Sequence, residues 1–282
     1  MELDGRAVLV TAAGRGIGRG IALALGAAGA RVAVNSWSED TTAATVAAIV
    51  EAGGEAVALP GDATDPAAIG ELVAATVERF GGLDLLVNNV GAAPKDGIAG
   101  AEDPLAALAS VWDALYAQNL RPAVLATEAA LPHLRASGRG AVVNISSIAG
   151  HTTLSDRMLS LMVHPAYGAM KAALSHFTRC AAELHGPEGV TVNAVCPGIV
   201  WTDAWRANAE LVTAQVPAFR GQDPRAWFEG IARGDYPEIF DRTPTRREQT
   251  VEEVAAAVVF LCSDAARSIT GQALMVDGGM VK

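Results

Sequence analysis

Residues 6–18 read RAVLVTAAGRGIG and join a strand pattern to a helix pattern through a glycine-rich turn. RAVLVT is a short apolar run of the kind found in buried strands, and IALALGAAGA, just after the turn, is typical of an amphipathic helix. Glycines there let the backbone approach a pyrophosphate, whose charge is met by free N–H groups and the helix dipole. The strict G-x-G-x-x-G spacing is absent because Arg19 holds the third glycine position, so a purely structural glycine turn stays open as the alternative.

The same kind of apolar run recurs along the chain, and segments of helical length and pattern separate the first six runs. The runs are RAVLVT (6–11), ARVAVN (30–35), EAVALP (55–60), LDLLVNN (83–89), GAVVNIS (140–146), VTVNAV (190–195) and ALMV (273–276). Apolar strands alternating with helices indicate a parallel sheet covered on both faces. We therefore predict one α/β domain over residues 1–282, a doubly wound, mostly parallel, seven-stranded sheet of Rossmann-like type. Ligands of such sheets bind beyond the carboxyl ends of the strands.

Composition excludes several classes of protein. The formal net charge of −10 argues against a nucleic-acid partner, which needs clustered Lys and Arg. No uncharged apolar run reaches the roughly 18 residues of a membrane span. The start, MELDGRAVLV, lacks the features of a secretory signal, so we expect a cytoplasmic protein. Three widely spaced cysteines and five histidines without ligand spacing predict no disulfide framework and no metal. A small molecule is the expected partner.

A second motif, HPAYGAMK, places Tyr167 four residues before Lys171. On a helix this spacing puts both side chains on one face. The chain contains only three tyrosines and three lysines, so the pair is unlikely to be a coincidence of composition. By itself the motif is weak, and its meaning depends on what surrounds it.

Together these motifs resemble the short-chain dehydrogenase/reductase family, from residue 6 to residue 279. Thr11, Gly16 and Gly18 match the family's T-G-x-x-x-G-x-G turn, with Ala12 in place of its first glycine. The other matches, in chain order, are Asp62 in GDATD, Asn88-Asn89-Val90-Gly91 for N-N-A-G, Asn119 in QNL, Ser147 in NISSIAG, Tyr167, Lys171, Pro197-Gly198, Thr202 and the ending ITGQALMVDGG. Each piece is weak alone, and their shared order carries the resemblance.

The resemblance implies a catalytic tetrad of Asn119, Ser147, Tyr167 and Lys171. Hydride transfer to a ketone develops negative charge on oxygen, so the site needs an acid and fixed donors. Tyr167 would be the acid/base, and the Lys171 ammonium is expected to lower the pKa of its phenol. Ser147 would donate to the substrate oxygen. Asn119 would hold a water that relays protons to Lys171, which in the family also binds the nicotinamide ribose.

The resemblance also implies a set of cofactor-binding residues. They are Thr11, Gly14, Arg15, Gly16, Ile17, Gly18, Ser36, Asp62, Ala63, Asn89, Gly91, Tyr167, Lys171, Pro197, Gly198 and Thr202. Ser36 stands where a carboxylate would bind the ribose of NAD, and Arg15 resembles the basic residue of NADP-preferring members. We therefore expect NADP(H) to be preferred over NAD(H). Arg15 as a solvated surface charge is the alternative.

Two departures from the family concern the substrate. The interval from Ser147 to Tyr167 is longer than usual and contains apolar residues, and residues 203–247 form a long, aromatic, proline-rich segment without strand pattern in the place of the substrate-covering loop. The candidate pocket residues are Met158, Leu161, Met162, Val163, Trp201, Trp205 and Trp227. Adaptable apolar walls suggest a bulky carbonyl compound. Packing within the protein, or against a neighbouring subunit, is the alternative for these side chains.

The sequence thus predicts an NADP(H)-dependent oxidoreductase, a ketoreductase or alcohol dehydrogenase that interconverts a carbonyl group and a secondary alcohol. One alternative uses a bound dinucleotide for a non-redox outcome such as dehydration or epimerisation. Another is a non-catalytic, dinucleotide-sensing protein. Family members are commonly homotetramers, so we expect a homo-oligomer, a tetramer or a dimer, with the apolar helix around residues 165–185 as a candidate interface.

Overall fold

The computed structural model describes residues 3–92, 104–153, 155, 159, 163–240 and 244–281. Its centre is a seven-stranded sheet in the order β3-β2-β1-β4-β5-β6-β7, in which every neighbouring pair is parallel. The strands are β1 (Ala7–Val10), β2 (Arg31–Ser36), β3 (Glu55–Pro60), β4 (Leu85–Asn88), β5 (Ala141–Ile145), β6 (Thr191–Pro197) and β7 (Ala273–Val276). All seven predicted runs form strands, which confirms the predicted fold class.

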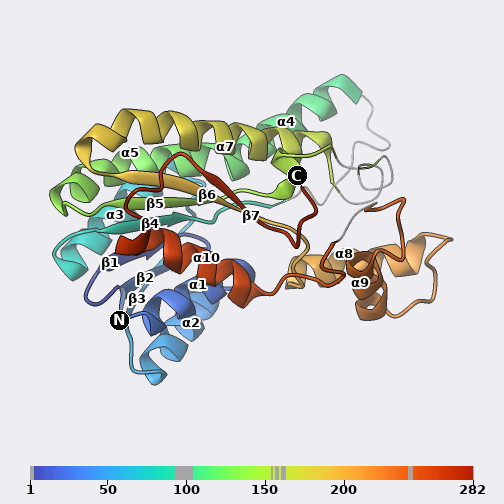
Figure 1. Ribbon diagram of the computed structural model, residues 1–282, viewed down its shortest axis with the longest axis horizontal. Helices are drawn as coiled ribbons and strands as arrows, with labels where there is room; N and C mark the ends of the chain where they lie inside the picture. The colour runs from blue at the N-terminus through green and yellow to red at the C-terminus, as the bar shows by residue number, and fades with distance from the viewer. Residues whose placement is uncertain are drawn as a thin grey trace.

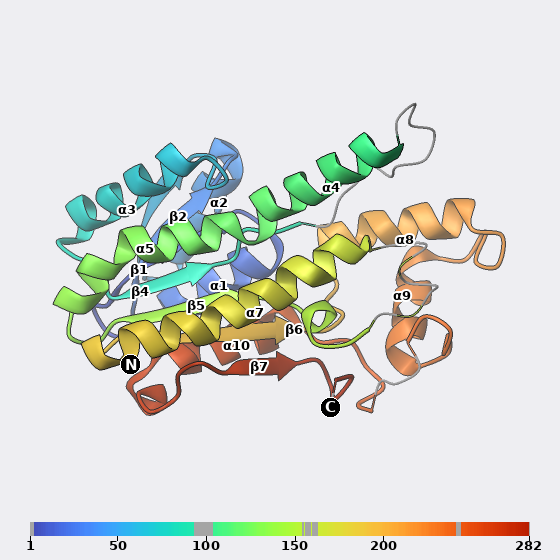
Figure 2. The same cartoon turned by 90° about the horizontal axis from the view of Figure 1, so that it is seen from above.

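Helices cover both faces of the sheet (Figures 1 and 2). On one face lie α1 (Gly16–Ala27), α2 (Glu39–Glu51) and α10 (Val251–Cys262), and on the other lie α3 (Pro66–Phe80), α5 (Arg121–Ala136) and α7 (Pro165–His185). Helix α4 (Pro104–Asn119) precedes α5 and extends beyond the sheet. Single-turn 3-10 helices complete the frame: η1 (Ile148–Gly150), η2 (Gly186–Glu188) and η3 (Asp264–Ala266).

Local sequence explains where several helices begin. Ser38 accepts a hydrogen bond from the backbone of α2, and Asp65 does the same for α3, which starts with a proline. Thr250 and Glu253 form a reciprocal capping box at the start of α10. The apolar side chains of these helices then pack on the sheet and form one hydrophobic core on each face. This arrangement fixes the carboxyl ends of the strands along one edge.

A third apolar cluster lies outside the two sheet cores. It is formed mainly by α8 (Asp203–Gln215) and α9 (Pro224–Arg233), which lie beyond the carboxyl edge of the sheet (Figure 1). Trp227 and Phe228 are completely buried there. The segment that showed no strand pattern is therefore a helical unit with a core of its own. No helix in the described part of the chain is long and apolar enough to cross a membrane.

Candidate active site

The glycine turn joins β1 to α1 at the carboxyl edge of the sheet. Gly16 has φ of +54°, and Ala12, at the position of the family's first glycine, has φ of +51°. An L-residue in this left-handed region costs about 1–2 kcal/mol. Ala12 thus keeps the backbone conformation of the glycine that it replaces. The resulting backbone strain must be offset by the contacts of Ala12 with its surroundings.

The turn leaves the start of α1 open to an anion. Helix α1 has no side-chain cap and no acidic residue in its first turn. A Cβ atom added to Gly14 would lie 2.6 Å from Ser36 Oγ, so only glycine allows this close approach between the turn and β2. Unsatisfied N–H groups and the positive end of the helix dipole attract phosphate. These features fit the pyrophosphate of a dinucleotide.

The other residues expected around a dinucleotide lie at the ends of successive strands. Ser36 is buried at the end of β2. Asp62 follows β3 and accepts hydrogen bonds from the backbone and hydroxyl of Thr64, while Ala63 is buried beside it. Arg15 and Ile17 lie in the glycine turn and the first turn of α1, and Arg15 is exposed and makes no ion pair with a described residue.

Thr11, directly after β1, and Asn89, directly after β4, are joined by hydrogen bonds. The Thr11 hydroxyl accepts from Asn89 N at 3.0 Å, and Asn89 Nδ2 donates to Thr11 O at 3.2 Å and Ala12 O at 3.0 Å. On the far side of the turn, the methyl carbon of Thr202 lies 3.7 Å from where a Cβ of Gly16 would stand. Thr202 also caps α8 through Trp205 N. The structure therefore brings residues from both halves of the chain to the glycine turn.

The four tetrad residues come from three elements, and two of them, Asn119 and Lys171, meet beside Gly91. Ser147 follows β5 and starts η1, Tyr167 and Lys171 lie one turn apart on α7, and Asn119 ends α4. Lys171 Nζ donates to Ile145 O at 2.9 Å and lies 5.7 Å from the centre of the Tyr167 ring.

Gly91 marks a space between two of these side chains. A Cβ atom on Gly91 would lie 2.8 Å from both Lys171 Nζ and Asn119 Oδ1. Asn119 Oδ1 is buried and has no hydrogen-bond partner among the described residues, while Asn119 Nδ2 donates to Ala92 O and Leu115 O. An orphaned oxygen and a buried ammonium facing one space suit a ligand or water with hydroxyl groups. This observation fits the ribose of a dinucleotide.

The structure corrects the expected pKa of Tyr167. Burial raises the pKa of the phenol above its usual value, and a hydrogen-bonding interaction with Ser147 only partly opposes this. The expected lowering by Lys171 is wrong for this arrangement, because burial of the phenol outweighs the contributions that lower its pKa. Burial also lowers the pKa of Lys171, to about 8. The desolvated amine holds its proton less firmly than a free lysine, and the phenol is protonated at neutral pH. Tyr167 is therefore set up as a proton donor.

Three supporting residues, Asn35, His151 and Gln249, were not predicted from the sequence, because their hydrogen-bond partners are distant in the chain. Asn35, at the end of β2, bonds to the glycine turn and to the end of β3. His151, at the end of η1, lies 2.8 Å from Ser175 Oγ on α7 and 3.4 Å from Cys196 Sγ on β6. It ties the turn that carries Ser147 to its neighbours.

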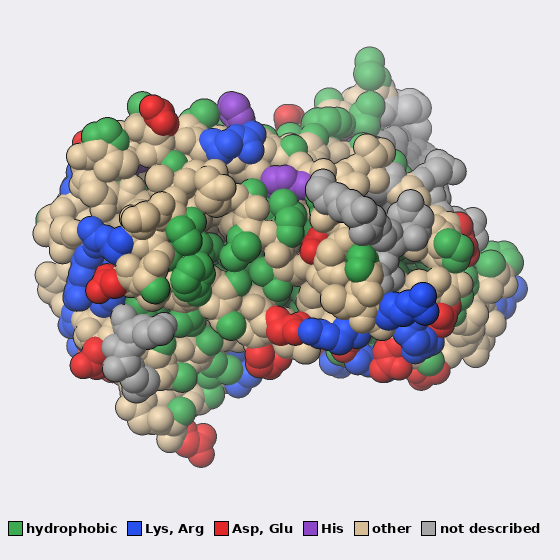
Figure 3. Space-filling view, viewed as in Figure 1, with side chains coloured by type: hydrophobic (Ala, Val, Ile, Leu, Met, Phe, Trp, Pro, Cys, Tyr) green, Lys and Arg blue, Asp and Glu red, His purple; other side chains and the backbone are tan. Residues whose placement is uncertain are grey.

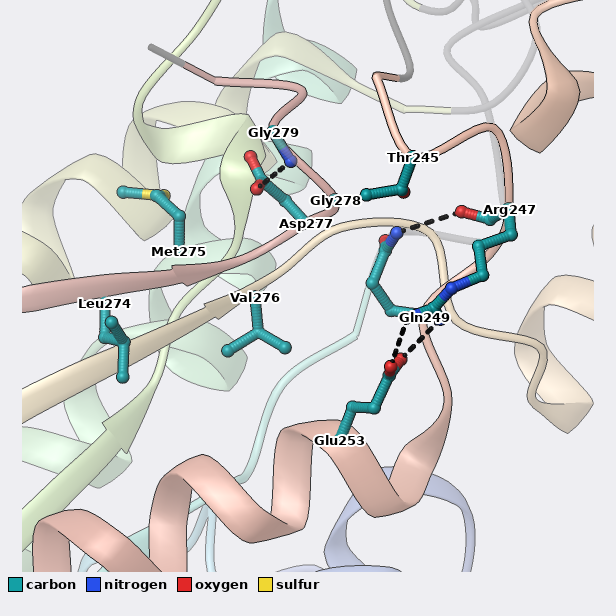
Figure 4. Close-up of a pocket in the computed structure, with 10 residues that line it drawn as sticks. All are labelled: Thr245, Arg247, Gln249, Glu253, Leu274, Met275, Val276, Asp277, Gly278 and Gly279. Carbon is teal, nitrogen blue, oxygen red and sulfur yellow. Dashed lines mark hydrogen bonds and ion pairs between the residues drawn. The ribbon is translucent and has the colours of Figure 1, made fainter.

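Gln249 supports the turn of Pro197 and Gly198 from behind. Its Oε1 accepts from Ile199 N at 3.0 Å. Its Nε2 donates to Arg247 O, as Figure 4 shows. Figure 4 also shows Asp277 turned back onto Gly279 N, at 2.8 Å. These residues border a surface cavity of about 280 Å³ that contains no member of the tetrad. Gln249 thus lines this cavity and also supports the turn at Gly198. The cavity itself is not the candidate active site.

The expected pocket residues have mixed outcomes. Trp227 is completely buried and packs on Phe219, so its proposed place in the pocket is wrong. Trp201 and Trp205 both contact the ring of Phe228, and Trp201 also borders a second cavity, of about 340 Å³. Val163 packs against the same aromatic cluster. The remaining candidates lie outside the described residues: Met158, Leu161 and Met162.

The fold is a doubly wound sheet with a glycine turn at the start of a helix, and Ser147, Tyr167 and Lys171 lie at the same edge. This combination is typical of oxidoreductases that use a nicotinamide dinucleotide. The "short chain dehydrogenase" family model matches residues 6–211, and a model described as "Enoyl-(Acyl carrier protein) reductase" matches residues 228–281. The chain belongs to the short-chain dehydrogenase family. Its relatives are named as oxidoreductases, reductases and dehydrogenases.

Three relatives illustrate the range of the family. The 3-oxoacyl-[acyl-carrier-protein] reductase of Synechocystis sp. is 34% identical over 99% of this chain and 98% of that protein. L-sorbose reductase of Gluconobacter frateurii, solved with NADPH and L-sorbose, is 27% identical with a TM-score of 0.84, over 100% of this chain and 99% of the other. A 7α-hydroxysteroid dehydrogenase, solved with NADH and 7-oxo glycochenodeoxycholic acid, is 29% identical with a TM-score of 0.78, over 99% of this chain and 96% of the other. The two solved structures each hold a nicotinamide dinucleotide, NADPH in one and NADH in the other.

Proposed function

We propose that the protein reduces a carbonyl group, or oxidises the corresponding secondary alcohol, with Tyr167 as the acid/base. The observation that carries this proposal is the shared space at Gly91, where Lys171 Nζ and Asn119 Oδ1 face each other beside the glycine turn. A bound dinucleotide supplies the hydride. Tyr167 donates a proton to the carbonyl oxygen, and Ser147 donates a hydrogen bond to the same oxygen. Lys171 binds ribose hydroxyls, and a water held by Asn119 relays protons to Lys171.

The test of the catalytic role is Tyr167→Phe, with Tyr116→Phe as the matched control. Tyr116 is 45% exposed on α4 and carries the same hydroxyl outside the site. Loss of a general acid should lower turnover about 10²- to 10⁴-fold while dinucleotide affinity stays within a few fold. Cofactor absorbance would be followed with bulky ketones. Full activity of Tyr167→Phe would overturn the assignment, and product formed without net cofactor consumption would favour the non-redox alternative.

Within this function we propose that NADP(H) is preferred over NAD(H). Ser36 leaves no carboxylate to repel a 2′-phosphate, and Arg15 is exposed and free of ion pairs with described residues. A guanidinium binds phosphate through two hydrogen bonds. Arg15→Gln should weaken NADP binding about tenfold and leave NAD binding unchanged, whereas Arg19→Gln, one turn further along α1, should change neither. Equal thermal shifts by both dinucleotides in the wild type would contradict the preference.

We further propose a bulky, largely apolar substrate. The aromatic cluster built on α8 and α9 packs against Ala149 and Val163. Apolar side chains of the covering segment (residues 203–247) thus meet apolar side chains of the long interval between Ser147 and Tyr167. A wall of this kind favours large apolar carbonyl compounds over sugars. Specificity constants measured for a steroid-sized ketone and for a ketose would decide this, and a clear preference for the ketose would refute it.

Assembly as a homodimer or homotetramer, and work in the cytoplasm, belong to the same proposal. The edge strand β7 exposes Leu274, neighbouring α10 exposes Phe260, and Figure 3 shows hydrophobic side chains gathered over this part of the surface. Leu184 is exposed on α7, the helix expected as an interface. Light scattering after size-exclusion chromatography would give the number of subunits, and a monomer at micromolar concentration would contradict the proposal.

A further inference from the structure

Ala12 has an unusual backbone for its residue type. Among the described residues outside glycine, only Ala12 and Arg246 have a positive φ, and Ala12 does so inside the glycine turn. A strained conformation of this kind persists only where the surroundings hold it in place. The contacts of Ala12 therefore matter for the shape of the turn.

Asn35 holds the amide side of Ala12. Its Oδ1 accepts from Ala12 N at 3.3 Å, and its backbone oxygen accepts from Ala13 N. Its Nδ2 donates to Leu59 O and Gly61 O, both at 3.0 Å. The side chain is 1% exposed, and these partners fix which way its amide group points. Asn35 thus connects the glycine turn to the end of β3.

Asn89 holds the other side of the same residue. Its Nδ2 donates to Ala12 O at 3.0 Å and to Thr11 O at 3.2 Å. Asn89 is one of the residues predicted from sequence, whereas Asn35 is not. Ala12 is therefore bonded at its N–H by one asparagine and at its C=O by another, and the two come from opposite sides of β1.

We propose that Asn35 is a positioning residue that keeps Ala12 in the left-handed conformation, and so keeps the turn in the shape that receives a pyrophosphate. A glycine at position 12 would hold this shape without help, whereas alanine requires it. Without the Asn35 side chain, Ala12 would relax to negative φ, and binding would have to restore the strained turn. Only this last step, the effect on binding, rests on the proposed function.

A double-mutant cycle of Asn35→Ala and Ala12→Gly tests the proposal. In the wild-type background, Asn35→Ala should raise the Kd for the preferred dinucleotide about tenfold, measured by calorimetry. In the Ala12→Gly background, the same substitution should raise Kd less than about threefold, because glycine needs no support. Equal effects in the two backgrounds would overturn the proposal. If Asn35→Ala does not fold, Asn35→Ser, whose hydroxyl is too short to reach Ala12, replaces it with the same expectations.

Asn193→Ala is the matched control. Asn193 is also 1% exposed, at the other side of the sheet on β6, and it too bonds backbone groups of a distant loop, Ile269 O and Gln272 N. Asn193→Ala should lower the melting temperature but change the Kd for the dinucleotide by no more than twofold, both in the wild-type background and in the Ala12→Gly background. The same coupling to Ala12→Gly at this position would mean that the effect is general destabilisation and would overturn the proposal.

A structural readout needs no dinucleotide. A crystal structure of the Asn35→Ala protein should show Ala12 at negative φ, and φ near +50° there would refute the positioning role whatever the protein binds. Conversely, failure of the wild type to bind either dinucleotide, together with a relaxed Ala12 in the variant, would refute the proposed function and leave the role of Asn35 in the turn standing.

Discussion

Lys171→Met is expected to abolish turnover and to stabilise the folded protein relative to the wild type at neutral pH. Lys171 is 3% exposed, and burial lowers the pKa of its amine from 10.5 to about 8. At 1.36 kcal/mol per pH unit, the difference between 10.5 and about 8 corresponds to about 3 kcal/mol by which the charged amine destabilises the fold. Methionine has a similar length and no charge. It leaves Ile145 O without its donor, which costs about 1–2 kcal/mol, so the net gain at pH 7 is about 1–2 kcal/mol.

The pH dependence is the sharper part of this prediction. Below pH 8 the folded and unfolded states both carry the proton on Lys171, so the full penalty is present in the wild type. Between pH 8 and pH 10.5 the unfolded state binds more protons than the folded state, so the wild type gains stability as pH rises. The variant has no such group. Its advantage should therefore shrink by about 3 kcal/mol across this window and turn into a deficit, since the cost at Ile145 O does not depend on pH.

Urea unfolding of both proteins at half-unit steps from pH 7 to pH 10.5 measures this difference directly, because the other titrating groups are common to both. A difference in free energy of unfolding that stays constant across the series would show that Lys171 is not a desolvated amine. The reasoning would be refuted if the free energy of unfolding of Lys171→Met, minus that of the wild type, were lower at pH 7 than at pH 10.

Two other substitutions test the site and the covering segment. Gly91→Ala places a carbon 2.8 Å from Lys171 Nζ and Asn119 Oδ1, so turnover should fall about 10- to 100-fold. Gly82→Ala, which meets nothing within 4 Å, should leave turnover unchanged, and equal losses in the two variants would contradict the assignment of this space. Trp227→Ala removes a completely buried ring and should lower the free energy of unfolding by about 3–5 kcal/mol, measured by urea denaturation. A loss below 1 kcal/mol would mean that the α8–α9 unit unfolds apart from the sheet.

The sequence predicted the sheet well because the signal for each strand is local. The runs of the five inner strands are apolar enough to be buried on both faces, and a parallel sheet then places the residues after the strands along one edge. Ser147, Asn89 and Asp62 could be assigned to that edge without any knowledge of distances. The long helix of Tyr167 and Lys171 was predicted over residues 165–185 and runs from Pro165 to His185.

What the sequence could not supply are quantities that depend on burial and on distant partners. Proximity of Lys171 suggested a lowered phenol pKa, but desolvation of the buried phenol dominates and raises its pKa. Trp227 has the composition of a pocket residue, and only the fold shows that Phe219 and its neighbours enclose it. Asn35 is an ordinary strand residue in the sequence, because its partner Ala12 lies 23 positions away.

Two unfavourable features lie at the carboxyl edge, and they have a thermodynamic consequence. Lys171 is buried with a weakened hold on its proton, and Asn119 Oδ1 has no partner among the described residues. A ligand that brings negative charge and hydroxyl groups to this edge relieves groups that the fold alone leaves unsatisfied. Part of its binding free energy is therefore the relief of costs already present in the free protein, and substitutions that remove those costs should raise stability and weaken binding together.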